Sequence, residues 1–196
     1  MMQFLYNKVV SWRYFSIKSV VTGGRMRNIV LTGFMGTGKT EVGRLLSEKL
    51  GYTLIDVDGE IEKEQGMTIT EIFRQHGEPR FRDIESAAIK RLSDLERAVI
   101  STGGGAVLRQ ENMDSLREKG VIVCLTATPG TIVKRTSGNN DRPLLQVENP
   151  IKKIEELLEF RKPYYEKADI MVDTENKKPY EVAEEIVKRI RAAFKC

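Results

Sequence analysis

The stretch GFMGTGKT at residues 33–40 decides how this chain folds, because it matches G-x-x-x-x-G-K-[ST] at every fixed position. Its glycines let the backbone turn sharply, so that successive N–H groups point inward at phosphate oxygens. Lys39 adds a full positive charge for the β- and γ-phosphates, and the Thr40 hydroxyl can coordinate Mg²⁺. The motif predicts a phosphate-binding loop for a nucleoside triphosphate, which we interpret as ATP.

The segments on either side of the loop fit this interpretation. Residues 28–33, NIVLTG, form a short apolar run that predicts a buried strand. Residues 40–50 carry apolar side chains at helical spacing, and Gly51 ends the predicted helix. The competing dinucleotide motif G-x-G-x-x-G fails, because Glu41 stands where its last glycine belongs.

Strands and helices alternate along the rest of the chain. We expect further strands at residues 53–57, 98–101, 121–125 and 170–172. We expect further helices at residues 59–65, 70–76, 78–95, 111–119, 129–136, 151–167 and 180–194. Several strands are continuously apolar, which is typical of a parallel sheet covered on both faces. Ligands of such sheets bind at the carboxyl ends of the strands, and the motifs described below fall there.

Length and composition fit one globular domain, or one domain with small appendages, without a basic face. The chain has 196 residues, of which 40% are hydrophobic and 31% charged. Residues 1–27 hold five basic residues and no acidic one, whereas the remainder holds 27 basic and 28 acidic residues. A near-neutral body argues against nucleic acid as a partner, and no apolar run of about 18 residues predicts a membrane helix. Cys124 lies in an apolar run and Cys196 is the last residue, so we expect no disulfide and a cytoplasmic location. We expect a monomer, because no obvious apolar surface stripe is left over.

The first 25 residues are basic, aromatic and free of acids, and they precede Met26. Three interpretations remain open. Translation starts at Met26, or the segment is a loosely ordered tail, or it is a targeting peptide without a clean apolar region or an A-x-A-like site. We therefore divide the chain into an N-terminal extension at residues 1–26 and a kinase domain at residues 27–196.

Two carboxylates close the second predicted strand. Asp56 and Asp58 are two apart, so in an extended chain both would face the ligand, one toward a metal and one toward an acceptor hydroxyl. The alternative is that an aspartate here caps the next helix. Gly103, Gly104 and Gly105 follow the third predicted strand, where they allow either close backbone approach to a ligand or a flexible turn.

Three arginines are candidates for binding anions. Arg82 lies three residues before Glu85 on a predicted helix, so it grips a ligand or pairs with that glutamate on the surface. Arg142 lies in the polar loop at residues 137–149, and loops of this kind are commonly lids. Arg161 lies late in a helical pattern as a second clamp or a surface charge, and Pro163 should bend or end that helix.

Together these motifs resemble the shikimate kinase family, from about Arg27 to the C-terminus. The resemblance is carried by GFMGTGKT at 33–40, DVD at 56–58, FRDIE at 81–85, GGG at 103–105, RPLL at 142–145 and RKPYYEKA at 161–168. It implies an α/β, three-layer P-loop NTPase fold with a five-stranded parallel sheet, helices on both faces and a lid loop. It also implies transfer of the ATP γ-phosphoryl group to the 3-hydroxyl of shikimate, on the route to chorismate and aromatic amino acids.

The resemblance also implies roles for individual residues. Asp58 is similar to the residue that binds the ring hydroxyls, and whether it also accepts the proton stays open. Arg82 and Arg161 resemble clamps on the shikimate carboxylate, and the Gly103, Gly104 and Gly105 backbone would contact shikimate. Catalytic roles fall on Lys39, Asp58 and Arg142, and the Mg²⁺ side on Thr40 and Asp56. The ATP-binding positions are Gly36, Thr37, Gly38, Lys39, Thr40, Glu41, Arg135, Arg142 and Pro179.

Two other functions remain as alternatives. One is another small-molecule kinase on the same scaffold, such as a gluconate kinase. The other is a nucleotide-binding module without catalysis, which the presence of Lys39, Thr40, Asp58 and Arg142 argues against.

Overall fold

The computed structural model describes residues 21–22, 25–137 and 149–193. Its centre is a five-stranded, all-parallel sheet in the order β4-β5-β3-β6-β7. The strands are β4 (Thr53–Asp56), β5 (Ala98–Ser101), β3 (Asn28–Gly33), β6 (Gly120–Thr126) and β7 (Ile170–Asp173). The predicted fold class is therefore confirmed, and the strand before the phosphate loop is the central one.

Eight helical segments accompany the sheet in the described part of the chain. They are α1 (Lys39–Leu50), α2 (Val57–Gln65), α3 (Ile69–Leu92), the 3-10 turn η2 (Ala106–Leu108), α4 (Gln110–Lys119), α5 (Pro129–Thr136), α6 (Pro150–Tyr165) and α7 (Pro179–Ala193). A separate pair of two-residue strands, β1 (Val21–Thr22) and β2 (Arg25–Met26), precedes β3 and was not predicted. Among the described helices, none combines the length and apolar character that crossing a bilayer requires.

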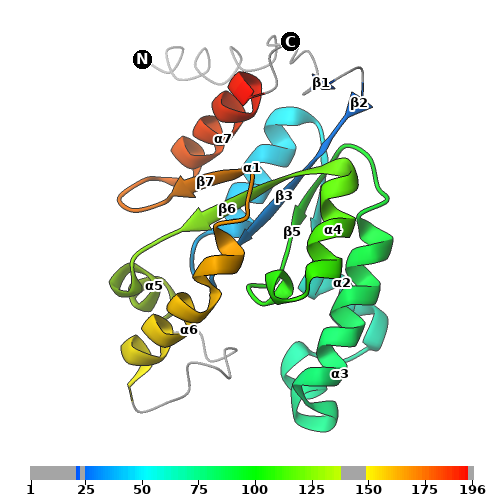
Figure 1. Cartoon of the computed structure of the whole chain (residues 1–196), viewed down its shortest axis with the longest axis vertical. Helices are drawn as coiled ribbons and strands as arrows, with labels where there is room; N and C mark the ends of the chain where they lie inside the picture. The colour runs from blue at the N-terminus through cyan, green and yellow to red at the C-terminus, as the bar shows by residue number, and fades with distance from the viewer. Residues whose placement is uncertain (1–20, 23–24, 138–148, 194–196) are drawn as a thin grey trace, which may run out of the picture.

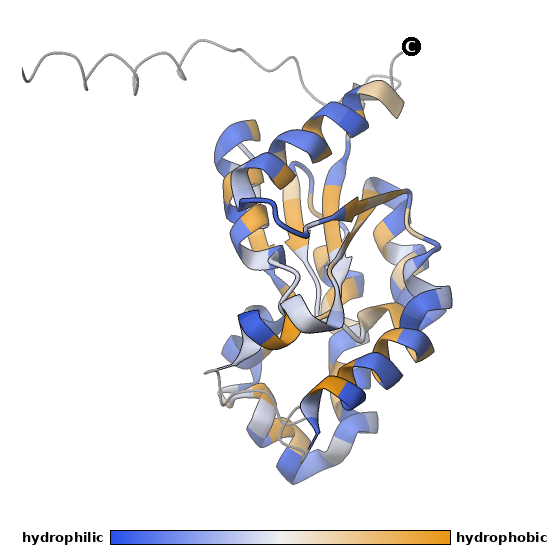
Figure 2. Cartoon of the chain, turned by 90° about the vertical axis from the view of Figure 1, so that its left-hand side faces the viewer, coloured by the Kyte–Doolittle hydropathy of each residue, from blue (hydrophilic) through white to orange (hydrophobic). Residues whose placement is uncertain are grey.

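The strands bury side chains on both faces, which produces three layers. Ile29 and Leu31 of β3 pack with α1 and α7, whereas Val30 packs with α2, α3 and α4 on the other face. This alternation follows from the two-residue period of a strand. Figure 1 shows α1 and α7 on one side of the sheet and α3 and α4 on the other. Figure 2 shows apolar residues along the strands and polar residues on the outer faces of the helices.

The prediction for residues 56–58 was wrong in its geometry. The strand ends at Asp56, and Val57 already belongs to α2, so Asp56 and Asp58 do not share one face of an extended chain. Asp56 instead caps α2, because its Oδ1 accepts a hydrogen bond of 3.3 Å from the Gly59 N–H. A short carboxylate that satisfies a free helix N–H explains why the helix begins earlier than predicted.

The predicted break at Gly77 is present, although α3 continues across it. Gly77 has the non-helical values φ 75° and ψ 170°, whereas the residues before and after it are helical. The left-handed φ suits glycine, which has no Cβ to clash. The kink divides α3 into a first part, whose Ile69 N–H donates to Glu62 of α2 at 2.8 Å, and a second part, which carries Arg82 and Glu85.

Candidate functional site

The phosphate loop joins β3 to α1 through three glycines in the left-handed region. Gly33, Gly36 and Gly38 have φ values of 128°, 76° and 91°, and Gly38 is the residue that caps α1. Lys39 folds over the loop, and its Nζ donates to the carbonyl oxygens of Gly33 at 2.8 Å and Phe34 at 3.0 Å. The loop thus carries a positive charge at the N-terminal end of a helix, where anions are stabilised.

Thr40 and Asp56 meet at the start of their helices. The Thr40 hydroxyl lies 3.5 Å from Asp56 Oδ2, while Oδ1 of the same carboxylate caps α2. Hard oxygen donors of this kind suit Mg²⁺, which takes one or two protein ligands and completes its shell with phosphate and water. Within the described residues, no group of three or more His, Cys, Asp or Glu side chains is placed to hold a metal. The two oxygens fit a nucleotide-bound Mg²⁺ better than a metal held by the protein alone.

The turn at Gly103–Gly105 lies against the phosphate loop on one side and against Asp58 and Arg82 on the other. A methyl group built on Gly103 would lie 2.9 Å from Asp58 Oδ1, and one on Gly105 would lie 2.6 Å from Arg82 Cζ. One on Gly104 would lie 3.3 Å from the Gly33 carbonyl oxygen in the phosphate loop. The turn leads into η2 and lies between α6 and α3 (Figure 1).

Arg82 projects from α3 toward this turn and is held by two glutamates. Its Nη1 donates to Glu85 Oε2 at 2.7 Å, and its Nη2 donates to Glu78 Oε1 at 2.8 Å. The sequence-based alternative of a surface pair is wrong, because Glu85 is fully buried and the Arg82 side chain is only 11% exposed. Burial raises the pKa of Glu85, and Arg82 opposes that rise in part. Such a pair fixes the arginine in one orientation.

Arg161 enters the site from α6, on the opposite side of the turn. Its guanidinium lies over the Phe34 ring, 5.4 Å from the centroid, and its Nη1 donates to the Gly104 carbonyl at 3.2 Å. The residue is 4% exposed, and its Nε has no hydrogen-bond partner among the described residues. The Nε of Arg161 therefore keeps a hydrogen-bond donor that an anion could satisfy.

The site therefore gathers most of the predicted acceptor residues around one turn. Asp58, Arg82 and Arg161 come from α2, α3 and α6, which are far apart in the sequence. Two guanidinium groups and a carboxylate converge next to the phosphate loop. This arrangement can hold an anionic molecule whose hydroxyl faces a nucleotide.

The remaining nucleotide-side residues are more dispersed. Arg135 bridges the phosphate loop and the segment after β7, through bonds to the Gly36 carbonyl at 3.3 Å and to Thr174 Oγ1 at 2.9 Å. Glu41 lies exposed on α1 and pairs with Arg44. Pro179 is exposed at the first position of α7. Arg142, the predicted lid arginine, lies outside the described residues.

Three residues of the site were not predicted as functional. Glu85 appeared only as a possible partner of Arg82, Phe34 only as a variable position of the loop motif, and Tyr165 had no role. The signal for Tyr165 was its spacing, because it follows Arg161 by four residues and so lies on the same helix face. Its hydroxyl donates to the Gly104 carbonyl at 2.8 Å.

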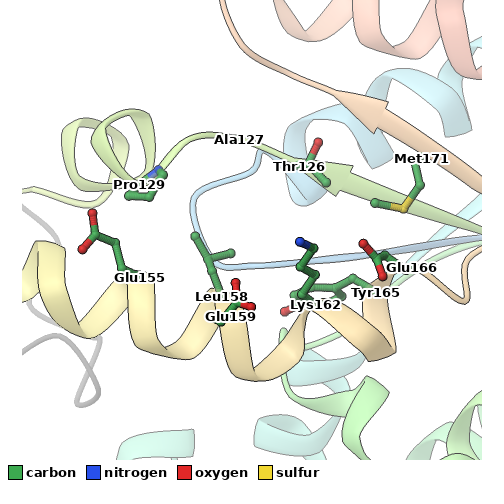
Figure 3. Close-up of a pocket in the computed structure, with 10 residues that line it drawn as sticks. All are labelled: Thr126, Ala127, Pro129, Glu155, Leu158, Glu159, Lys162, Tyr165, Glu166 and Met171. Carbon is green, nitrogen blue, oxygen red and sulfur yellow. The ribbon is translucent and has the colours of Figure 1, made fainter.

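A separate cavity of about 440 Å³ lies between α6 and the ends of β6 and β7. Figure 3 shows Leu158, Lys162 and Tyr165 of α6 along its wall, together with Thr126 and Met171 of the strands. It holds none of the predicted site residues. Tyr165 lines this cavity, and its hydroxyl binds the Gly104 carbonyl in the Gly103–Gly105 turn.

Comparisons with known proteins point to one family. The family model described as shikimate kinase matches residues 35–191. The shikimate kinase of Thermodesulfovibrio yellowstonii is 57% identical over 83% of this chain and 94% of the relative. That of Caldanaerobacter subterraneus is 50% identical over 83% of this chain and 95% of the relative. Among solved structures, the shikimate kinase from Acinetobacter baumannii in complex with shikimate matches with a TM-score of 0.83 and 39% identity, over 85% of this chain and 94% of that chain.

Proposed function

The chain belongs to the shikimate kinase family, and we infer that it transfers the γ-phosphoryl group of ATP to the 3-hydroxyl of shikimate, which gives shikimate 3-phosphate and ADP. Its two substrates are ATP and shikimate. The observation that carries the assignment is the contact of one glycine turn with both halves of the site. Gly104 packs against the phosphate loop, while Gly103 and Gly105 pack against Asp58 and Arg82.

The acceptor half matches the chemistry of shikimate, a small polyhydroxylated acid. Arg82 and Arg161 are proposed to hold its carboxylate, because planar guanidinium groups match a carboxylate in two-point contacts. Asp58 is proposed to bind the ring hydroxyls and to receive the proton of the 3-hydroxyl. The backbone at Gly103, Gly104 and Gly105 is proposed to approach the ring closely, which side chains there would prevent.

The donor half supplies positioning and positive charge. Phosphoryl transfer has a loose transition state, so orientation and neutralisation contribute more than a strong base. Gly36, Thr37, Gly38 and Lys39 are proposed to surround the phosphates, with Lys39 moving from the loop carbonyls to the β- and γ-phosphate oxygens. Thr40 and Asp56 would hold Mg²⁺ on the nucleotide, where the ion neutralises phosphate charge.

The nucleotide-side proposals extend beyond the loop. Arg135 is proposed to pack near the adenine, where its bonds to Gly36 and Thr174 fix its guanidinium. Pro179 and Glu41 are proposed as further nucleotide contacts. The proposal for Arg142, a lid arginine that reaches ATP, stands on its sequence motif.

Further proposals concern the molecule as a whole. Residues 1–26 are proposed as an extension and residues 27–196 as the kinase domain. We propose a cytoplasmic monomer without membrane partners. We also propose no nucleic-acid partner, since the chain after residue 27 has nearly balanced charge. The buried Cys124 fits a reducing compartment.

A coupled assay of ADP release tests the function. The full chain is given ATP, Mg²⁺ and one acceptor, which is shikimate, gluconate or a nucleoside monophosphate. We expect turnover with shikimate alone and a phosphorylated product that is detectable by mass spectrometry. The matched variant Lys39→Met should lose about 10²- to 10³-fold in kcat, as expected for removal of one charge-stabilising donor.

The two alternatives give different results in the same assay. Turnover with gluconate and not with shikimate would replace the substrate assignment. ATP binding without ADP release under any condition would indicate a nucleotide-binding module instead.

A further inference from the structure

The Gly104 carbonyl accepts two hydrogen bonds from one face of α6. Arg161 Nη1 donates at 3.2 Å and Tyr165 Oη donates at 2.8 Å. The two residues are four apart, so they lie one above the other on the helix. Both are almost fully buried, at 4% and 5% exposure, so neither bond competes with bulk water.

The turn depends on such outside contacts for its position. Three consecutive glycines have no side chains to pack, and their backbone has more freedom than any other sequence. Part of the support comes from the opposite end, where the Ala106 N–H donates to the Gly103 carbonyl at 3.2 Å. The buried Asn112 Nδ2 in turn donates to the Ala106 carbonyl at 3.0 Å. At Gly104 the support comes from α6.

The two α6 donors differ in what else they must do. Arg161 is proposed to clamp the shikimate carboxylate, so its guanidinium is shared between the acceptor and the turn. The Tyr165 phenol has a single proton to donate, and the turn receives it. Burial raises the pKa of this hydroxyl to about 12, although Arg161 opposes the rise, and the phenol therefore stays a donor at neutral pH.

We propose that Tyr165 is a positioning residue for phosphoryl transfer, whose hydroxyl keeps the Gly104 carbonyl in place while Arg161 engages the acceptor. Tyr165 acts through the turn and does not touch the substrates. The inference rests on the proposed function, in that the turn is taken to contact shikimate. It assigns to the C-terminal end of α6 a part in holding the acceptor opposite the phosphate loop.

Tyr165→Phe in the full chain tests this inference, because the ring stays packed in the core and a single hydroxyl is lost. We expect KM for shikimate to rise about two- to tenfold, the range set by one intramolecular hydrogen bond. KM for ATP should stay at the wild-type value. Amide hydrogen exchange across residues 103–106 should become faster, since Gly104 keeps only the Arg161 bond.

Tyr52→Phe is the matched control. Tyr52 is also buried, at 8% exposure, but it packs against the opposite face of the sheet. Its hydroxyl has no hydrogen-bond partner among the described residues. This variant should keep both KM values and the exchange rate of the turn.

The outcomes separate the inference from the function on which it rests. A wild-type KM for shikimate in Tyr165→Phe, or an equal rise in KM for ATP, would overturn the positioning role. Unchanged exchange at residues 103–106 would overturn it as well. Failure of the wild-type chain to phosphorylate shikimate would overturn the proposed function, and the exchange experiment would still report whether Tyr165 holds the turn.

Discussion

Glu85 is a charged side chain that the acceptor half of the site buries completely. One of its oxygens binds Arg82, whereas Oε1 has no hydrogen-bond partner among the described residues. A methyl group built on Gly103 would lie 3.0 Å from that Oε1, on the same side as Asp58. A buried carboxylate beside a second carboxylate is expensive to ionise. Because Glu85 also binds Arg82, the ionisation of Glu85 makes the orientation of Arg82 depend on pH.

Glu85→Gln should remove a pH-dependent part of the stability. Because burial raises the pKa of Glu85, the folded chain keeps this proton to a higher pH than the unfolded chain does. The stability that this bound proton contributes is present in full below the ordinary pKa of 4.5. It is lost as the pH rises through the raised pKa of Glu85 in the folded chain. Urea midpoints measured from pH 4 upward should show the wild type losing stability relative to Glu85→Gln.

Glu78→Gln is the control for that series. Glu78 pairs with the same arginine but is 52% exposed, so the variant reports the loss of an Arg82 ion pair without the loss of a buried carboxylate. If the wild type instead gained stability over Glu85→Gln with rising pH, the ion pair would outweigh burial, and the sign argued above would be wrong.

Asp58→Asn separates proton acceptance from substrate positioning. The amide retains a hydrogen-bonding oxygen of the same shape but cannot take up the proton of the acceptor hydroxyl. We expect kcat to fall about 10²-fold, at the low end for a general base, because the loose transition state needs little deprotonation. KM for ATP should be unchanged in the same coupled assay. Full turnover in this variant would remove the proton-accepting role and leave only positioning.

At the scale of elements, the glycine turn works because it leaves space for Arg82. Gly105 has φ −99° and ψ −7°, which any residue can adopt, so its backbone does not require glycine. The requirement is steric, since a Cβ there would lie 2.6 Å from both Arg82 Cζ and Nη1. That guanidinium is also bound by Glu78 and Glu85, and it cannot move without breaking those contacts.

Gly105→Ala should therefore weaken shikimate binding more than it destabilises the fold. We expect KM for shikimate to rise roughly tenfold to hundredfold, the effect of losing one hydrogen bond to a charged group. KM for ATP should change little. Steady-state kinetics with each substrate varied in turn provide the measurement.

Gly130→Ala on α5 controls for the added methyl group, because a Cβ there meets nothing within 4 Å. It should behave as the wild type. Equal losses of affinity for ATP and shikimate in Gly105→Ala would mean that the whole turn had moved, and the steric argument for Arg82 would fail.

The elements also show where prediction from sequence succeeds and where it stops. The apolar runs and the loop motif were sufficient for all five sheet strands and for the parallel sheet. The helix start at Val57 was missed, because the same residues are compatible with a strand that continues to Val57 and with a helix that Asp56 caps. Glu85 and Tyr165 were missed for another reason. The pairing of Glu85 with Arg82 was expected, but its burial beside Gly103 depends on the tertiary fold, and so does the bond of Tyr165 to the distant Gly104.

At the scale of the whole molecule, different elements supply the residues proposed to bind each of the two substrates. The phosphate loop lies at the end of the central strand β3, while the acceptor residues come from α2, α3 and α6 around it. The Gly103–Gly105 turn follows β5, the neighbour of β3 in the sheet. A site assembled at the carboxyl ends of adjacent parallel strands is what a sheet of this class favours. The relative position of the phosphate loop and the glycine turn therefore depends on the sheet register, in which Ile29 lies opposite Val99.

Removal of the extension at residues 1–25 tests the proposed domain boundary. A chain that begins at Met26 loses β1 and Arg25 of its partner strand β2, but keeps β3 and every described residue of the site. Its kcat and both KM values should stay within about twofold of the full chain, as expected when a terminal segment outside the proposed kinase domain is removed. Its thermal midpoint should also be unchanged, because the core clusters that the described residues form begin at position 29. A loss of activity or stability would show that residues 1–25 belong to the working domain, and the boundary at residues 26 and 27 would then be wrong.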